Sequence, residues 1–533
     1  MNFAPPRPAQ PSDQPSRTAF SHRLRPQIGL APGLRLLALP LLLSLALPAA
    51  CSAQTPAQSL VPASAARAIA PAPADPAIAA ALKQVSPERI QAIIARLVEF
   101  KTRATLSSMD TDLAPGTGIS ASADWIEAQF KQISAECNNC LEVKRDDFVE
   151  PGSDAANSRI RKPTRLTNVY AVLRGTDPAQ ANRRVLVTGH YDSRVTDIMN
   201  SHSDAPGAND DASGVAVSLE CARVLSKLKF PSSIVFVAVA GEEQGLNGSR
   251  HLARLAKAEG WQLEAVLNND IVGGDTTPGD TGQDKFAVRV FSEGVPSPTT
   301  PEGAPDQIRL IHSLGSDSDS PSRELARTIT EVSSTYFPGA RPHTISVRPP
   351  FHPVLIFRAD RYLRGGDHTS FNLEGFPAVR FTEWQENFNH QHQDLRVENG
   401  IQYGDLLQFV DFHYVANVAR LNAAVLGDLA AAPGVPENVH ILTQALDNNT
   451  ELQWQPPTGA SAGTSYEVVW RPTNQPTWTE ALSTGTATTV RVAVSKDNVI
   501  FGVRSVDSAG HRSIAVLPLP LGRTTPRPAT TKN

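Results

Sequence analysis

The sequence has few cysteines, no block of basic residues and no long uninterrupted apolar run. Four cysteines in 533 residues are too few for a disulfide-rich scaffold. The 49 basic and 53 acidic residues give a net charge of −4, and because the basic residues are not gathered into a block, no nucleic-acid partner is indicated. A chain of this length exceeds one hydrophobic core, so we expect two or more domains.

The most apolar stretch lies near the N-terminus, at residues 36–50. It contains Pro40 and Pro48, so it is too short and too broken to span a membrane. Arginines precede it and small residues follow it, which predicts an export signal region over residues 1–53 and a secreted or periplasmic protein. A lipid anchor at Cys51 is the alternative, but the nearest leucine lies one position too far away for a good lipidation motif.

Residues 54–80 are mostly Ala, Pro and Ser, with few charges. They hold too little apolar bulk to pack, so we predict a linker. The main domain then extends over residues 81–430.

Cys137 and Cys140 form a C-x-x-C pair, which fits a redox pair, half a zinc site or a small-loop disulfide. The sequence has no second C-x-x-C, and a disulfide suits an exported protein, so we prefer it. Cys221 lies on the apolar face of a predicted helix, which indicates a buried free thiol.

The main domain alternates apolar runs with amphipathic stretches, which predicts an α/β fold with a mostly parallel sheet. The predicted strands are residues 166–173, 184–189, 234–240, 265–270 and 377–381. The predicted helices include residues 118–134, 249–258, 321–336 and a long closing helix at 399–429. Residues 276–318 are rich in Gly, Pro, Asp and Ser and are predicted to be a loop insertion, broken by a strand-like segment at 286–291.

Acidic residues and a histidine follow these predicted strands. They are His190 with Asp192, the pair Asp210 and Asp211, the pair Glu242 and Glu243, and Asp270. The carboxyl ends of parallel strands meet at one edge of a sheet, where α/β proteins bind ligands. Helix capping explains one of the paired aspartates, and a solvated turn is the alternative for the paired glutamates. Adjacent buried carboxylates are costly without a cation, so together these residues predict a hydrolytic metal centre.

A histidine-rich segment at residues 389–394 follows the last predicted strand and supplies a further nitrogen ligand. Either His390 or His392 can provide it.

These motifs, in this order, resemble the dizinc aminopeptidase family that includes the bacterial leucyl aminopeptidases. Glutamate carboxypeptidases, glutaminyl cyclases and transferrin receptors share its fold. The resemblance covers roughly residues 86–429 and implies a three-layer sandwich with a mostly parallel mixed central sheet. The motifs that carry it are residues 189–193, 206–214, 240–245, 269–270 and 367–368, and His390 with Asp394.

The resemblance implies two Zn²⁺ ions per chain. The implied ligands are His190, Asp210, Glu243, Asp270 and His390. Among them, His190 and Asp270 hold one ion, Glu243 and His390 hold the other, and Asp210 bridges both. His390 is preferred to His392 because the family spacing is His, three residues, then Asp.

The resemblance also implies roles for residues that do not bind metal. Glu242 is the general base, and Asp192 is the partner that orients the ring of His190. Asp367 and His368 shape the substrate pocket. The family's carbonyl-polarising tyrosine has no clear counterpart, and Tyr362 is the candidate.

The sequence therefore predicts a secreted dizinc aminopeptidase that acts on peptides or proteins. A zinc carboxypeptidase is one alternative, with Arg358, Arg361 and Arg364 as candidates to bind a substrate carboxylate. A glutaminyl cyclase with a single zinc is another. A catalytically inactive, receptor-like binding protein of the same fold would lack the ligands, which are all present here.

Residues 435–520 contain short strand-like runs separated by turns. Trp454, Tyr466 and Trp470 are spaced as in a small all-β sandwich, and the pattern resembles a fibronectin type III domain. We expect it to contact a cell surface or polymer, or to act as a spacer, and to be dispensable for hydrolysis of small peptides. Residues 521–533 are rich in Pro and Thr and are predicted to be a disordered tail.

Overall fold

The computed structural model describes residues 59–298, 300, 302–339 and 350–521. The predicted export signal, including Cys51, the start of the predicted linker and nearly all of the predicted tail lie outside the described residues. Among the described helices, none combines the length and the apolar character needed to span a membrane.

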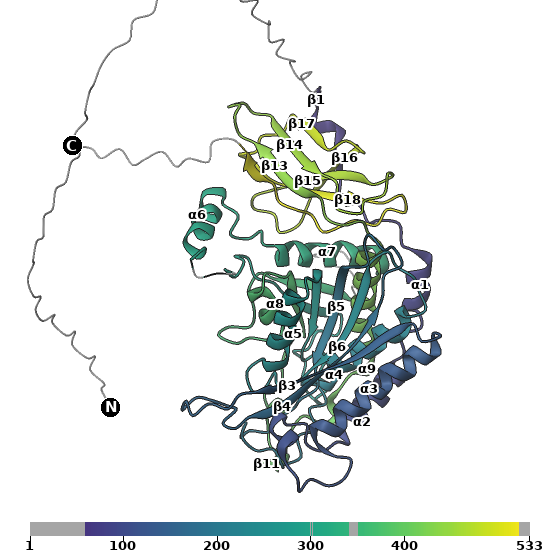
Figure 1. Cartoon of the computed structure of the whole chain (residues 1–533), viewed down its shortest axis with the longest axis vertical. Coiled ribbons are helices and arrows are strands. Elements are labelled where there is room, and N and C mark those ends of the chain that lie inside the picture. Colours follow the sequence, from purple (N-terminus) through teal and green to yellow (C-terminus); the bar gives the residue numbers. More distant parts are fainter. Residues whose placement is uncertain (1–58, 299, 301, 340–349, 522–533) are drawn as a thin grey trace, which may run out of the picture. The chain divides into compact units, whose positions relative to one another are not determined.

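An eight-stranded mixed sheet forms the centre of the main domain (Figure 1), in the order β3-β4-β6-β5-β7-β10-β8-β9. Its strands are β3 (Leu141–Glu150), β4 (Thr164–Leu173), β5 (Arg183–His190), β6 (Ser233–Val239), β7 (Gln262–Asn269), β8 (Ala287–Phe291), β9 (His352–Ile356) and β10 (Ala378–Glu383). The four central strands β6, β5, β7 and β10 run parallel. Antiparallel pairings flank them at β4 and β8, so the predicted α/β class with a mostly parallel mixed sheet is confirmed.

Helices cover both faces of this sheet, which gives three layers. One face carries α1 (Pro76–Leu82), α2 (Pro87–Val98), α3 (Gly118–Glu136), α4 (Ala212–Leu225), α7 (Pro321–Tyr336) and α9 (Phe412–Ala431); the other carries α5 (Asn247–Ala258) and α8 (His368–Leu373). Side chains alternate between the two cores along each strand. In β5, Val185 and Val187 belong to the first core and Leu186 to the second.

The strand-like segment predicted within the insertion is confirmed as β8, which joins the central sheet. Two other predictions were wrong. The insertion is not otherwise a loop, because it forms the helix α6 (Ala304–Leu314). The closing helix begins at residue 412 rather than 399, because residues 396–403 form a hairpin of β11 (Arg396–Glu398) and β12 (Ile401–Tyr403). Gly400 in its turn has a φ of 79°, which favours glycine.

The cysteine predictions are confirmed. Cys137 and Cys140 form a disulfide, and Cys221 is a buried free thiol.

The C-terminal region folds into two facing β-sheets, as predicted. One sheet has the order β1-β17-β14-β13-β19 and the other β18-β15-β16-β2. The C-terminal strands are β13 (Glu437–Leu442), β14 (Thr450–Gln455), β15 (Ser465–Pro472), β16 (Glu480–Gly485), β17 (Thr489–Val492), β18 (Val499–Val506) and β19 (Leu519–Leu521). Trp454, Tyr466 and Trp470 lie in the core between the sheets.

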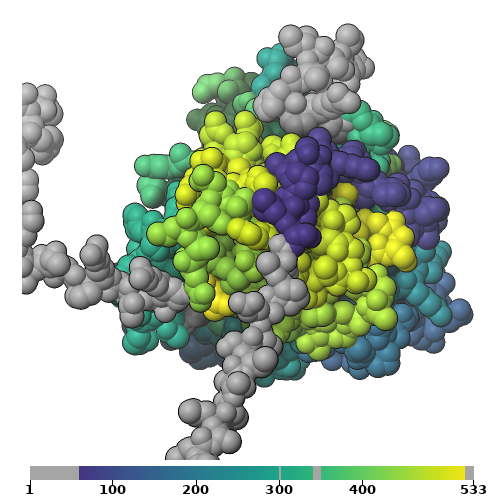
Figure 2. All heavy atoms as spheres, turned by 90° about the horizontal axis from the view of Figure 1, so that it is seen from above, coloured from purple at the N-terminus to yellow at the C-terminus, as the bar shows by residue number. Residues whose placement is uncertain are grey.

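The linker prediction for residues 54–80 fails in its described part. Two short strands, β1 (Leu60–Val61) and β2 (Arg67–Ala68), each add to one sheet of the C-terminal sandwich, beside β17 and β16. Figure 2 shows this purple N-terminal segment against the yellow-green C-terminal strands. Val61 and Ala66 pack against the sandwich core. The composition of residues 54–80 predicted too few apolar side chains for packing, but the two sheets of the sandwich provide the surfaces against which this segment packs.

Buried ion pairs join the sandwich to α7. Asp319, just before α7, contacts both Arg327 of α7 and Arg471 of β15. Arg327 also donates from Nε to the carbonyl oxygen of Pro476 at 2.7 Å. Farther along α7, Glu331 pairs with Arg504 of β18 at 2.7 Å. The sandwich therefore contacts the main domain through charged side chains of which Asp319, Arg327, Arg471 and Arg504 are buried and Glu331 is partly buried.

Candidate metal centre

The carboxyl ends of β5, β6 and β7 bring the predicted acidic residues and His190 to one edge of the sheet. His190 is the last residue of β5, and Asp270 directly follows β7. His190 Nε2 lies 3.1 Å from Asp210 Oδ1 and 3.8 Å from Asp270 Oδ1. These three buried side chains form the first of two adjoining groups that could hold a metal ion.

The second group consists of Asp210, Glu243 and His392. His392 Nε2 lies 3.0 Å from Asp210 Oδ2 and 3.1 Å from Glu243 Oε1. Asp210 thus presents one carboxylate oxygen to His190 and the other to His392. A carboxylate that faces two separate imidazoles in this way has the geometry of a bridging ligand.

The preference for His390 over His392 was wrong. The Nδ1 atom of His390 lies 3.2 Å from Asp275 Oδ1, and its ring stacks on Phe409 with a centroid separation of 3.8 Å. Residues 387–391 form a turn that directs His390 away from the cluster, and His392, with a φ of 58°, follows it. Asp394, whose spacing favoured His390, accepts from the backbone N–H of Thr196.

The carboxylate of Asp211 connects three backbone segments at the candidate metal centre. It caps α4 by accepting from the N–H of Gly214 at 3.0 Å, and it also accepts from the N–H groups of His190 at 3.0 Å and Ile271 at 3.2 Å. The capping role expected for one of the paired aspartates is therefore confirmed. A single buried carboxylate fixes the ends of β5 and β7 against the start of α4.

Asp192 lies behind His190, as predicted. Its Oδ1 is 3.5 Å from His190 Nδ1, while His190 Nδ1 also lies 3.1 Å from the Asp192 carbonyl oxygen. The same carboxylate accepts from the N–H groups of Glu242 at 3.2 Å and Glu243 at 3.1 Å. Asp192 therefore orients the imidazole and also fixes the glutamate pair at the end of β6.

The sequence analysis missed two supporting residues. Asp405 accepts from the N–H groups of Asn209 at 2.9 Å and Asp210 at 2.7 Å, which fixes the backbone of the residue that faces both histidines. Arg103 is fully buried and donates to the carbonyl oxygens of Tyr191, Leu97, Pro206 and Gly207. Neither residue has a local motif, since each acts on a loop about 100 to 200 positions away in sequence.

The pKa values show how strongly these charges interact. Burial lowers the pKa of His190, but Asp192, Asp210 and Asp270 outweigh it and raise the pKa well above its usual range. Burial likewise opposes protonation of His392, yet Glu243 and Asp210 raise its pKa to about 10. Burial and the neighbouring carboxylates raise the pKa of Glu242 well above its usual range. The carboxylates of the cluster therefore strongly stabilise a positive charge that lies among them.

The three predicted substrate-binding residues are placed differently from one another. Asp367 is fully buried, neither of its carboxylate oxygens has a hydrogen-bond partner among the described residues, and burial raises its pKa to about 7. His368 is buried and its Nε2 lies 2.7 Å from the carbonyl oxygen of Ala359. Tyr362 is 75% exposed and lies beside Arg358, outside the pocket lining, so its prediction as a carbonyl-polarising residue is not supported.

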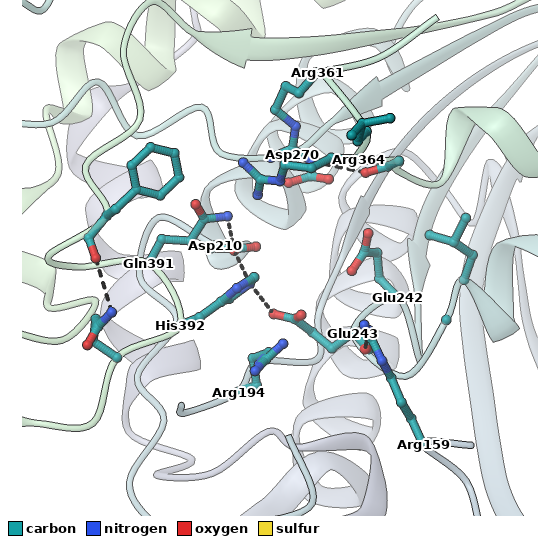
Figure 3. Close-up of a pocket in the computed structure, with 16 residues that line it drawn as sticks. Arg159, Arg194, Asp210, Glu242, Glu243, Asp270, Arg361, Arg364, Gln391 and His392 are labelled. Carbon is teal, nitrogen blue, oxygen red and sulfur yellow. Dashed lines mark hydrogen bonds and ion pairs between the residues drawn. The ribbon is translucent and has the colours of Figure 1, made fainter. Parts of the chain in front are cut away.

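A cavity of about 710 Å³ opens over the cluster. Its lining includes Asp210, Glu242, Glu243, Asp270 and His392 (Figure 3). Four arginines also line it: Arg159, Arg194, Arg361 and Arg364. The cavity is large enough for a short peptide.

The donor set fits zinc. Imidazole nitrogens and carboxylate oxygens are its ordinary protein ligands, and three buried carboxylates meet two imidazoles here. Oε1 of Glu243 is buried without a hydrogen bond, and its contact with His392 is an ion-pair distance only. Such an oxygen is costly to bury without a cation.

The sequence profile of peptidase family M28 matches residues 168–330. A probable zinc metalloprotease of Leptosphaeria maculans is 45% identical over 453 residues, which cover 85% of this chain and 99% of the relative. A probable zinc metalloprotease of Pyrenophora teres f. teres is also 45% identical over 453 residues, covering 85% and 89%. The chain belongs to peptidase family M28.

In this M28 family member the profile match includes four residues of the cluster, His190, Asp210, Glu243 and Asp270, while His392 lies beyond it. Solved structures are more distant. The aminopeptidase LapA of Legionella pneumophila is 19% identical with a TM-score of 0.42, over 66% of this chain and 74% of that one. A glutaminyl cyclase of Porphyromonas gingivalis is 20% identical with a TM-score of 0.38, over 64% and 97%.

Proposed function

We propose that this M28 family member is an exported, zinc-dependent aminopeptidase that hydrolyses the N-terminal bond of peptides at a centre of two Zn²⁺ ions. The observation that carries the proposal is the placement of Asp210, with its two oxygens facing different histidines. The names of the relatives, probable zinc metalloproteases, support zinc. The disulfide between Cys137 and Cys140 supports export, because such bonds persist in oxidising compartments.

The ligands would be divided between two positions. His190 and Asp270 would hold one ion, Glu243 and His392 the other, and Asp210 would bridge them. When bound, the metal pair lowers the pKa of a water and polarises the substrate carbonyl.

Glu242 is the general base in this proposal. It lines the pocket beside Glu243 but belongs to neither ligand group. Its carboxylate takes a proton from the attacking water and transfers it to the leaving amine nitrogen. Asp192 contacts both the ring of His190 and the backbone of Glu242. It therefore fixes the positions of the proposed ligand, His190, and the proposed base, Glu242, relative to each other.

The test replaces Glu242 with Gln, which keeps the shape of the side chain and removes its basicity. We expect kcat on aminoacyl-p-nitroanilides to fall by about 10²- to 10⁴-fold, with zinc content unchanged by metal analysis. Glu136→Gln, an exposed glutamate at the end of α3, is the matched control and should keep full activity. Full activity in E242Q would refute the proposed base.

Other members of the fold suggest the competing activities. A carboxypeptidase would hydrolyse peptides with blocked amino ends and spare those with blocked carboxyl ends, whereas an aminopeptidase does the reverse. A glutaminyl cyclase would hold one zinc per chain. Activity lost to a chelator and restored by zinc would separate all of these from a metal-free binding protein.

We propose that the C-terminal sandwich is a fibronectin type III-like domain that contacts a cell surface or polymer. Its two sheets and the core around Trp454, Tyr466 and Trp470 support a domain of that kind. Binding of the purified protein to whole cells or insoluble polysaccharide tests the contact, and equal recovery in the unbound fraction with and without that surface would contradict it.

A further inference from the structure

The arginines on the Asp270 side of the pocket are paired with neighbouring acids. Arg361 pairs with Asp360 and Glu386 at 3.0 Å each, and Arg364 pairs with Glu386 at 2.7 Å. A third, buried guanidinium, Arg380, contacts Asp270 at 2.9 Å and Asp360 at 3.5 Å. Each of these arginines therefore has a carboxylate partner, Asp360 or Glu386, that belongs to neither ligand group.

Arg159 and Arg194 lie on the opposite side of the pocket, beside Glu243 (Figure 3). Arg159 comes from the loop between β3 and β4, and its Nη1 donates to the carbonyl oxygen of Glu243 at 2.7 Å. Arg194 comes from the loop after β5 and donates to the carbonyl oxygens of Val195 at 3.0 Å and Thr196 at 2.9 Å. Within the described parts of the chain, neither guanidinium forms an ion pair with a carboxylate.

Backbone carbonyls fix these two guanidiniums in place but do not cancel their charge. Under the proposed function Asp210, Glu243 and Asp270, which also line the pocket, are committed to the metal ions, and Glu242, the fourth acid of the lining, is the base. Two guanidiniums without a carboxylate partner among the described residues therefore lie beside the reaction centre. Arg159 is an exposed residue, but its contact with Glu243 holds its guanidinium at the residue next to the proposed base, Glu242, where it lines the pocket.

We infer that Arg159 and Arg194 form a subsite for a carboxylate of the substrate, so that the enzyme favours peptides with a carboxylate close to the scissile bond. The inference rests on the proposed peptidase function. A guanidinium matches a carboxylate with two parallel N–H donors, and charge-assisted hydrogen bonds of this kind are among the strongest in proteins. The carboxylate can come from an acidic side chain or from the C-terminus of a dipeptide.

Two substrate pairs separate these sources. Ala-Glu-amide against Ala-Gln-amide tests a side-chain carboxylate, and Ala-Ala against Ala-Ala-amide tests the terminal one. We expect kcat/KM to favour the carboxylate member of at least one pair by about tenfold or more. In Arg159→Gln and in Arg194→Gln that ratio should fall towards one.

Arg358→Gln is the matched control. Arg358 is an exposed arginine near the pocket that lies over the ring of Tyr362 and does not line the cavity, so its removal should leave the ratio as in the wild type. A general effect of charge would instead lower the ratio in all three variants. A ratio near one for both pairs in the wild-type enzyme, or a preference unchanged in both Arg159→Gln and Arg194→Gln, overturns the inference.

Binding supplies a second readout that does not depend on turnover. Calorimetric Kd values of the same four peptides for zinc-loaded E242Q should show the same carboxylate preference, and adding Arg194→Gln should remove it. If no peptide is hydrolysed by the wild-type enzyme, the proposed function fails, while the Kd ratios still decide the subsite. If amide peptides are hydrolysed without any carboxylate preference, only the subsite fails.

Discussion

Asp319 is the most sensitive point of the junction between the sandwich and the main domain. Its side chain is 2% exposed and contacts Arg327, which is 1% exposed, and Arg471, which is 3% exposed. The two guanidiniums oppose each other, since Arg327 lowers the pKa of Arg471 although burial lowers it more. Asp319→Ala would leave Arg471 without an ion-pair partner among the described residues, beside Arg327, which keeps its pair with the buried Glu324.

The magnitude follows from this burial. Removing one partner of a buried ion pair costs about 3–5 kcal/mol, because the remaining charge stays desolvated. A chain of this length has an unfolding entropy of about 1 kcal/mol/K near its midpoint. We therefore expect Asp319→Ala to lower the Tm by about 3–5 °C if the described chain melts as one unit, and by more if the sandwich separates first.

Differential scanning calorimetry with an exposed carboxylate as control tests this reasoning. Asp317 lies two positions away, is exposed and has no ion pair among the described residues, so Asp317→Ala should move the Tm by less than about 0.5 °C. Adding Arg471→Met to Asp319→Ala removes the cation that lost its partner and should restore part of the loss. Equal Tm values for the two alanine variants would refute the argument.

Three further predictions follow from particular side chains. His392→Ala should lower the zinc content from two ions to about one per chain by metal analysis, whereas His390→Ala should leave it unchanged. Asp405→Ala should weaken zinc binding by about 10- to 100-fold in a chelator competition, because the backbone of the bridging aspartate loses its support. Val61→Asp should lower the Tm, because this partly buried side chain packs against the sandwich core and an unpaired charge placed there loses part of its hydration.

Matched variants control the last two. Asp394→Ala removes a carboxylate that accepts only from Thr196 in the described structure, and it should leave zinc affinity intact. Leu60→Asp changes an exposed neighbour in β1, and it should leave the Tm nearly unchanged. Equal losses within either pair would contradict the structural assignment of that pair.

Some features could be predicted because they depend on the local sequence alone. Continuous apolar runs such as β6 must be buried on both faces, and the residues that follow such strands must arrive at one edge of the sheet. That reasoning places His190, Asp210, Glu243 and Asp270 together from the sequence alone. It missed β3, however, because Leu141–Glu150 is largely polar and lies at the edge of the sheet.

Other features depended on contacts between distant segments. The choice of His392 over His390 is set by the direction of a loop, and residue spacing carries no information about that direction. Asp405 and Arg103 reach the site from elsewhere in the chain, so no motif marks them. Composition describes residues 60–68 in isolation, whereas their strands exist because distant sheets offer open edges.

The amino-acid sequence by itself determined the alternation of strands and helices and the residues that deliver charge to the sheet edge, because both follow from periodicity and from strand ends. Only the tertiary structure decided which histidine joins the cluster, which carboxylates hold it in place and which of the described pocket arginines have no carboxylate partner. These outcomes depend on the paths of loops and on burial, which arise from the whole chain packing together.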